Sequence, residues 1–189
     1  MKILDQLTLF LKITGSHTIA RRYFVVNGFD GVLTMLGIIM GFHISHHPDL
    51  KVIINTCLGA AVALTVSGLT SAYISEAAER QNSLRQLEQA MVSDLADSAH
   101  GKAARLVPAL IAMVNGLAPL LLSLLIISPL WFAASLPLPP LLVSIGAGLA
   151  VTFFLGVFLG QVSGVFWLWS GLRTLLIALA TCGIILLFD

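Results

Sequence analysis

The sequence predicts an all-α polytopic membrane protein with five transmembrane helices. Of its 189 residues, 58% are hydrophobic and only 10% are charged, and the mean hydropathy is +0.98. A soluble domain averages about 25% charged residues, so the composition excludes an ordinary soluble fold. A span needs about 20 mostly apolar residues to cross the hydrocarbon core. Five segments meet this requirement: Phe24–Ile44, Val52–Ser75, Leu106–Phe132, Leu141–Val162 and Trp167–Phe188.

The basic residues predict the orientation of these spans. Four precede the first span, four lie between spans two and three, and Arg173 lies near the start of span five. Only Lys51 falls on the opposite side. Because short cytoplasmic loops are rich in Lys and Arg, we expect a cytoplasmic N-terminus, an external C-terminus and a location in the plasma membrane. No basic patch interleaved with aromatic residues indicates a nucleic-acid partner.

Two segments outside the spans have a helical pattern. Residues 1–22 contain apolar side chains at a helical period, which predicts an N-terminal interfacial helix. The five-span transmembrane domain then covers residues 23–189. Within it, the polar stretch 79–105 predicts one short cytoplasmic helix that continues span two and ends near Gly101, a plausible helix stop.

Three carboxylates stand in or beside the spans. Asp30 lies about two turns into span one, Glu76 lies at the cytoplasmic end of span two, and Glu79 follows one turn later on nearly the same helix face. Acids inside a membrane are costly and commonly mark an ion or substrate path. Span one runs outward and span two returns, so we expect the three acids to lie at a similar depth and to converge.

Each acid also has a structural interpretation, which the sequence leaves open. Glu76 can form an i,i+4 ion pair with Arg80 at the membrane surface. Glu79 can be a solvated surface charge. Asp30 can be a buried structural acid or an N-cap-like residue in its Asn-Gly-x-Asp-Gly turn.

Further candidate metal ligands lie near these acids. Asn27 and Asn115 supply amide oxygens, and Met35 supplies a thioether, although methionine in a membrane helix is more often packing. Oxygen ligands suit hard or borderline divalent cations, and a thioether shifts the preference towards softer metals. The combination favours Fe²⁺ or Mn²⁺ over Mg²⁺.

The histidines permit two interpretations. His43, His46 and His47 lie at the external end of span one, where they form either a transition-metal site or an interfacial loop. No Ser/His/Asp set, HExxH motif or phosphate-binding loop occurs, so we expect no enzyme activity.

Rows of small residues predict close helix packing. Gly37 and Gly41 form a GxxxG motif in span one, and Gly156, Gly160 and Gly164 continue that period in span four. Such rows let helix backbones approach, either within a chain or at a homodimer seam. Because five spans make a small bundle, a polar path is enclosed more easily between two copies. We therefore expect a homodimer.

An internal repeat relates spans one and three. "VNGFDGVLTMLGIIMG" (26–41) and "VNGLAPLLLSLLIISP" (114–129) share their opening and an apolar run. Both spans run outward, which predicts a parallel repeat of a helix pair with span five added. The second copy is neutral where the first carries acids.

These motifs resemble the vacuolar iron transporter family, in particular its short prokaryotic members without the long cytoplasmic metal-binding insert. The resemblance rests on "RRYFVVNGFDGVLTMLGIIMG", on "SAYISEAAER" closing span two and on "NGLAP" opening span three. It implies a five-helix protomer, a homodimer with the ion path between protomers, and proton-coupled export of Fe²⁺ or Mn²⁺ from the cytoplasm. It also implies that Asp30 and Glu76 line the path and that no cofactor is tightly bound.

Two functional hypotheses follow. In the first, Asp30 and Glu76, helped by Asn27 or Asn115, bind a divalent metal at the cytoplasmic mouth and exchange it for protons, as partly desolvated carboxylates can do. In the second, the protein is a membrane scaffold or assembly factor. Its acids then pair with arginines such as Arg80 and stabilise the helix bundle.

Overall fold

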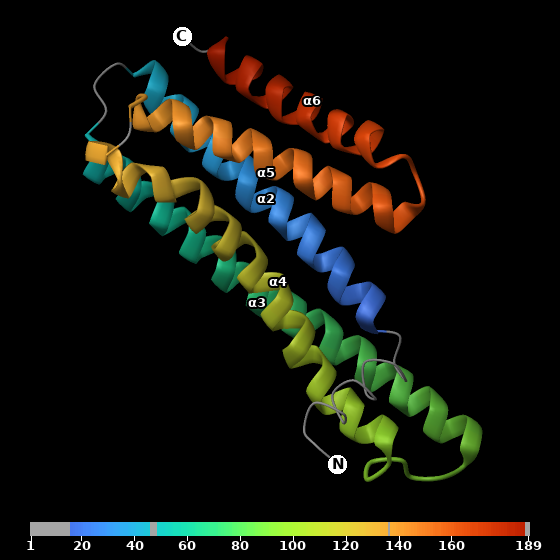
Figure 1. Cartoon of the computed structure of the whole chain (residues 1–189). Helices are drawn as coiled ribbons and strands as arrows, with labels where there is room; N and C mark the ends of the chain where they lie inside the picture. The colour runs from blue at the N-terminus through green and yellow to red at the C-terminus, as the bar shows by residue number, and fades with distance from the viewer. Residues whose placement is uncertain (1–15, 46–48, 136, 188–189) are drawn as a thin grey trace. The chain divides into compact units, whose positions relative to one another are not determined.

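The computed structural model describes residues 16–45, 49–135 and 137–187, which are all-helical. The elements in chain order are α2 (Ser16–Ile44), α3 (Leu50–Met91), α4 (Ala99–Trp131), the short 3-10 helix η1 (Ala133–Ser135), α5 (Pro140–Ser163) and α6 (Trp167–Leu186) (Figure 1). The five α-helices are each long and apolar enough to cross a membrane. The prediction of five helices long and apolar enough to span a membrane is therefore confirmed, as expected of an integral membrane protein.

Two of the expected element boundaries differ from the structure. The N-terminal interfacial helix expected over 1–22 lies largely outside the described residues, and residues 16–22 form the first turns of α2. The stretch 79–105 is not one helix, because α3 ends at Met91 and α4 begins at Ala99. The expected helix stop at Gly101 is wrong, since this residue lies in the first turn of α4.

Side-chain hydrogen bonds explain where α4 begins. The hydroxyl oxygen of Ser98 accepts a hydrogen bond from the Gly101 backbone N–H at 3.2 Å, which is the geometry of an N-cap residue and the third helical position. A Cβ atom at Gly101 would collide with the backbone carbonyls of Leu95 and Ala96. Only glycine fits at position 101, because the backbone of the α3–α4 turn at residues 95 and 96 occupies the space of a side chain.

The described helices form two compact units, each of which combines segments far apart in sequence. The first, the hairpin unit, holds the start of α2 (16–24), the second half of α3 and the first half of α4 (66–117 for both with their turn). The second, the five-helix unit, holds the remainder of α2, α3 and α4 together with all of α5 and α6.

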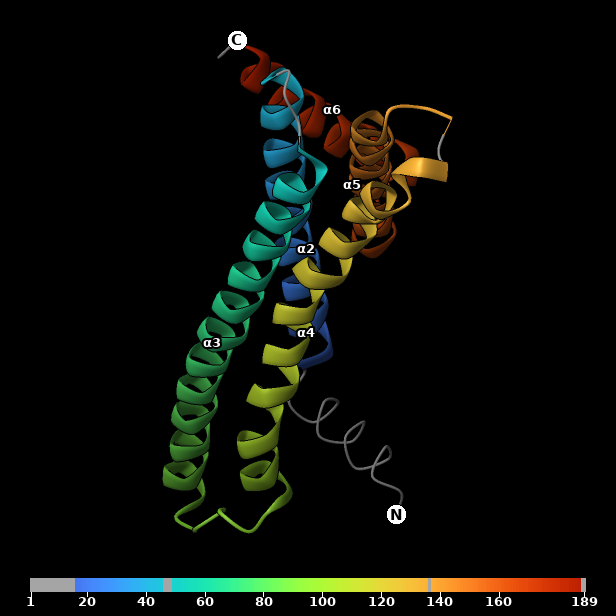
Figure 2. The same cartoon turned by 90° about the vertical axis from the view of Figure 1, so that its left-hand side faces the viewer.

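A small apolar core joins α4 to the start of α2 in the hairpin unit. Ala103, Val107 and Ile111 lie one turn apart on α4 and are fully buried, and Ile19 and Tyr23 of α2 pack against them. The i, i+4, i+8 spacing of the three α4 residues places them on one helix face. Within this unit α3 and α4 run side by side (Figure 2).

In the five-helix unit, small residues let α5 and α6 approach closely. A Cβ atom at Gly156 would collide with Thr174, and one at Gly160 would lie 2.7 Å from the Ser170 side chain. The Thr174 hydroxyl donates a hydrogen bond to the Thr152 backbone carbonyl at 3.0 Å. Gly156 and Gly160 therefore pack helices within one chain.

Gly164 does not extend this row, because it ends α5. Its φ of 70° is left-handed, and the Val165 backbone N–H donates to the Gly160 carbonyl at 3.1 Å. This is the Schellman motif, in which glycine is the preferred residue. Of the first-span pair, Gly37 faces the Ile185 side chain, whereas a Cβ built at Gly41 would contact no neighbouring side chain among the described residues. A dimer seam at this pair stays a prediction.

The same motif ends α3, but with a valine in the left-handed position. Val92 has a φ of 49°, and the Ser93 N–H donates to the Glu88 carbonyl at 3.3 Å. A left-handed conformation costs a residue with a Cβ about 1–2 kcal/mol. Because Val92 is 92% exposed, no packing offsets this cost.

We expect Val92→Gly to stabilise the folded protein by about 0.5–1 kcal/mol, the left-handed penalty less the greater unfolded-state entropy of glycine. Thermal unfolding in detergent measures the change. The matched control is Gly164→Val at the equivalent position of α5, which should lower the melting temperature. A Val92→Gly variant no more stable than the parent would show that the strain is absent.

Candidate functional site

Asp30 lies in the interior of α2 with its side chain exposed. The carboxylate makes no hydrogen bond or ion pair with any residue that the structure describes. A charged side chain near the centre of a membrane-spanning helix costs about 2.5–3.5 kcal/mol on insertion scales. Something outside the described part of one chain, such as water, a cation or another protein surface, must therefore solvate this carboxylate.

Two glycines determine that Asp30 faces outward. A Cβ atom at Gly31 would lie 2.8 Å from the Cα of Pro119 on α4, and one at Gly28 would lie 3.0 Å from the Leu122 side chain. These residues are three apart, so they share the face of α2 that packs inside the five-helix unit. Asp30 lies off that face and is exposed. The structure does not place it as the buried structural acid that the sequence left open.

The other first-span candidates differ from Asp30 in exposure. Asn27 is half-buried, and Met35 is fully buried in the packed interior. His43 is exposed in the last turn of α2, while His46 and His47 lie outside the described residues. Burial of Met35 fits the packing role that methionine usually has in a core.

Asn115 joins α4 to α3 in the hairpin unit. Its side chain is 2% exposed, and its Nδ2 donates a hydrogen bond to the Gly68 backbone carbonyl at 2.8 Å. A Cβ atom at Gly68 would lie 3.3 Å from the Cα of Gly116, so the two backbones nearly touch here. The amide of Asn115 therefore holds a close helix crossing.

Glu76 adopts the arrangement of its structural interpretation. Its residue is 6% exposed, and its Oε2 lies 3.4 Å from Nη2 of Arg80 one turn later. Glu79 is exposed and makes no ion pair with a described residue. Both side chains are largely buried, so each charge has lost part of its hydration. The opposite charge beside it compensates that loss, which a fully hydrated surface pair does not require.

The two groups of candidates belong to different units. Asp30, with its first-span neighbours, lies in the five-helix unit, whereas Glu76, Glu79 and Asn115 lie in the hairpin unit. Over the described ranges, no three His, Cys, Asp or Glu side chains gather as a metal site. The convergence of Asp30 with Glu76 stays a prediction.

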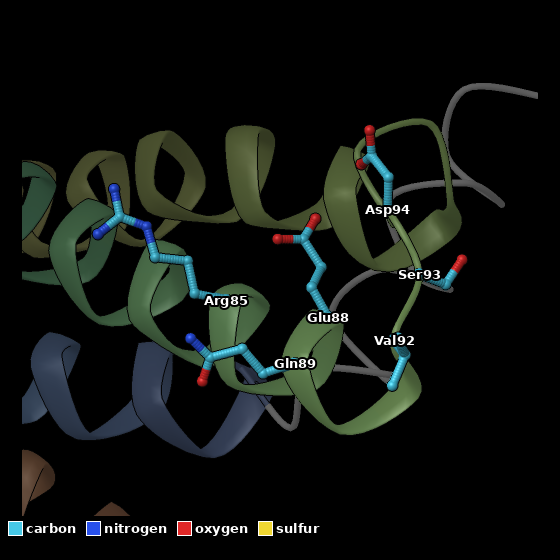
Figure 3. A pocket seen from close by; sticks show the side chains of 6 residues that line it. All are labelled: Arg85, Glu88, Gln89, Val92, Ser93 and Asp94. Carbon is cyan, nitrogen blue, oxygen red and sulfur yellow. The ribbon is translucent and has the colours of Figure 1, made fainter.

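A shallow, open surface pocket of about 550 Å³ lies beside the turn between α3 and α4 (Figure 3). It is lined by Arg85, Glu88, Gln89, Val92, Ser93 and Asp94. Each of its carboxylates stabilises the turn: Glu88 accepts from the Leu95 N–H at 3.1 Å, and Asp94 from the Ala96 N–H at 2.8 Å. These hydrogen bonds give both acids a structural role without a ligand.

Arg173 is a residue to which the sequence analysis gave no role beyond orientation. It is exposed on α6, and its guanidinium lies 5.3 Å from the ring centre of Trp169 one turn earlier. An arginine within a span, four residues after a tryptophan, was the available signal for such a cation–π contact.

We expect Asn115→Ala to destabilise the protein by roughly 1–2 kcal/mol, because it removes an interhelical hydrogen bond and leaves a cavity beside Gly68. Equilibrium unfolding in mixed micelles measures this change. Asn55→Ala is the matched control, since Asn55 is exposed on α3 and makes no hydrogen bond with a described residue. Equal effects of the two substitutions would contradict the assigned role.

Comparison with known proteins places the chain among relatives. No family model matches the sequence, and no solved structure matches it. The chain is similar to the uncharacterized protein MJ0645 of Methanocaldococcus jannaschii, with 30% identity over 162 residues. The alignment covers 84% of this chain and 83% of the archaeal protein. The chain therefore belongs to the same protein family as this archaeal relative.

Proposed function

We propose that the protein is a divalent transition-metal transporter that exports Fe²⁺ or Mn²⁺ from the cytoplasm through a homodimer in exchange for protons. The observation that carries this proposal is the exposed carboxylate of Asp30 on an apolar helix, which has no partner among the residues that the structure describes. Intramembrane acids of this kind mark ion paths. Because the carboxylate faces away from its own helix bundle, the path it serves lies between two copies.

The choice of cargo and direction rests on the sequence. The resemblance to vacuolar iron transporters implies Fe²⁺ or Mn²⁺ and proton coupling. The bias of Lys and Arg implies a cytoplasmic N-terminus, which puts the α3–α4 turn in the cytoplasm as well. Asn27, three residues before Asp30 on the same helix, is the nearest candidate for an amide ligand.

Glu76 has a distinct role in this proposal. At the cytoplasmic end of span two, its carboxylate is neutralised by Arg80 at 3.4 Å when no cation is bound. An arriving divalent cation competes with the guanidinium for the same oxygens. Glu76 then receives the cation at the cytoplasmic end of span two.

Transport into proteoliposomes of defined pH tests the proposal. Asp30→Asn removes the charge with almost no change in shape, and we expect it to lower proton-driven Fe²⁺ or Mn²⁺ flux at least tenfold. The matched control is Asp49→Asn, because Asp49 caps α3 at its exposed start, where asparagine serves equally well. Full flux through Asp30→Asn would refute the role of Asp30 in the path, and absence of proton-driven flux through the parent protein would refute the transporter.

A membrane scaffold is the second candidate, and the Glu76–Arg80 ion pair favours it. If both charges serve only to stabilise α3, the swap Glu76→Arg with Arg80→Glu should preserve the fold and the biological function. If Glu76 receives a cation, the swapped protein should fold and dimerise normally but lose metal flux. Size-exclusion chromatography beside the flux assay separates the two outcomes.

A further inference from the structure

Arg173 is the only charged residue of α5 and α6 over their described lengths. Its side chain is exposed and stacks on Trp169, and no described carboxylate lies within ion-pair distance of it. Asp30 presents the complementary situation on α2, an exposed carboxylate without an ionic partner among the described residues. Apart from Lys51 in the first turn of α3, the helices of the five-helix unit thus display one charge of each sign without an ionic partner among the described residues.

Contacts within the five-helix unit place these two charges at a similar level. A Cβ atom at Gly28, two residues before Asp30, would lie 3.7 Å from the Leu155 side chain on α5. The next residue, Gly156, packs against Thr174, the neighbour of Arg173. Because each residue rises 1.5 Å along a helix, Asp30 and Arg173 lie within about one turn of the same level.

The direction of the helices preserves this match. Gly37, farther along α2, lies opposite Ile185, farther along α6, so the two helices run in the same direction. A second copy related by a twofold axis along the membrane normal keeps every residue at its own depth. Asp30 of one copy and Arg173 of another are then at comparable depths.

Both charges lie on open faces. The buried residues of α6 are Gly171, Thr174, Ala178 and Cys182, which face α5, whereas Arg173 lies off this row. On α2, the neighbour of Asp30 on the exposed side is Val26, which is 52% exposed. Each open face is mostly apolar and carries a single charge, which is a surface that a second membrane-embedded copy can cover.

We propose that Asp30 of one copy forms an ion pair with Arg173 of a second copy, twice in a symmetric dimer. A lipid phosphate could compensate Arg173 but would leave Asp30 uncompensated, whereas the interchain pair compensates both. In a twofold dimer each copy contributes one acid and one base, so the contact is self-complementary. The inference rests on the homodimer of the proposed function. In that dimer, the partner's arginine at position 173 is ion-paired with the Asp30 carboxylate when no cation is bound.

Cross-linking between two differently tagged, co-expressed chains tests the pair. One chain carries Asp30→Cys and the other Arg173→Cys, both with Cys57→Ala and Cys182→Ala, and membranes are treated with a bis-methanethiosulfonate reagent about as long as an arginine side chain. We expect at least tenfold more two-tag product than with Val62→Cys in place of Asp30→Cys. Val62 is a suitable control because it is also exposed on a span, at 55%.

Charge reversal supplies an independent measurement. Asp30→Arg alone and Arg173→Asp alone should each lower the dimer fraction in detergent at least fivefold, and the double variant should restore it. Absence of the two-tag product, or failure of the double variant to restore the dimer, would overturn the pair. Retained anionic lipid that is lost with Arg173→Gln, in a protein giving no two-tag product, would instead assign Arg173 to a lipid phosphate.

Neither readout depends on metal flux. A two-tag product from a parent protein that shows no proton-driven metal flux would leave the ion pair standing and reject the transporter. Flux through the parent that is lost in Asp30→Asn, in a protein that gives no two-tag product, would support the transporter and reject the ion pair.

Discussion

The contact between Gly31 of α2 and Pro119 of α4 fixes the arrangement on which the candidate site depends. A side chain at Gly31 would collide with the proline backbone, so this face of α2 must pack inward. Asp30, the residue directly before Gly31, consequently lies on the outward side of the helix. An acid exposed within a span must be solvated by something beyond the described part of one chain, and the proposed ion path and the proposed interchain ion pair would each meet that requirement.

The number of spans was predictable because each apolar run is long enough to cross a bilayer without an interruption. The α3–α4 turn was not, because its left-handed position is occupied by Val92, where a sequence-based analysis looks for glycine. Gly101 was misread for the complementary reason. It follows a serine N-cap and lies under the turn, so it begins a helix where glycine more often ends one.

The site was predictable to a different degree at each residue. The Glu76–Arg80 pair follows from i,i+4 spacing, which is local information. The partner of Asn115 is a backbone carbonyl 47 residues away, which carries no side-chain signature in the sequence. Exposure of Asp30 depends on which face of α2 meets α4, and only the assembled helices determine that.

The Gly31–Pro119 contact also constrains how the two halves of the chain can diverge. Both residues are the fifth of their Asn-Gly motif, so equivalent positions of the internal repeat meet each other. The proline ring at position 119 fits only because Gly31 opposite it has a hydrogen atom in place of a side chain. If the halves arose by duplication, the duplicated chain could not have kept proline at both positions 31 and 119. Substitutions at these two positions should therefore appear as compensating pairs among relatives.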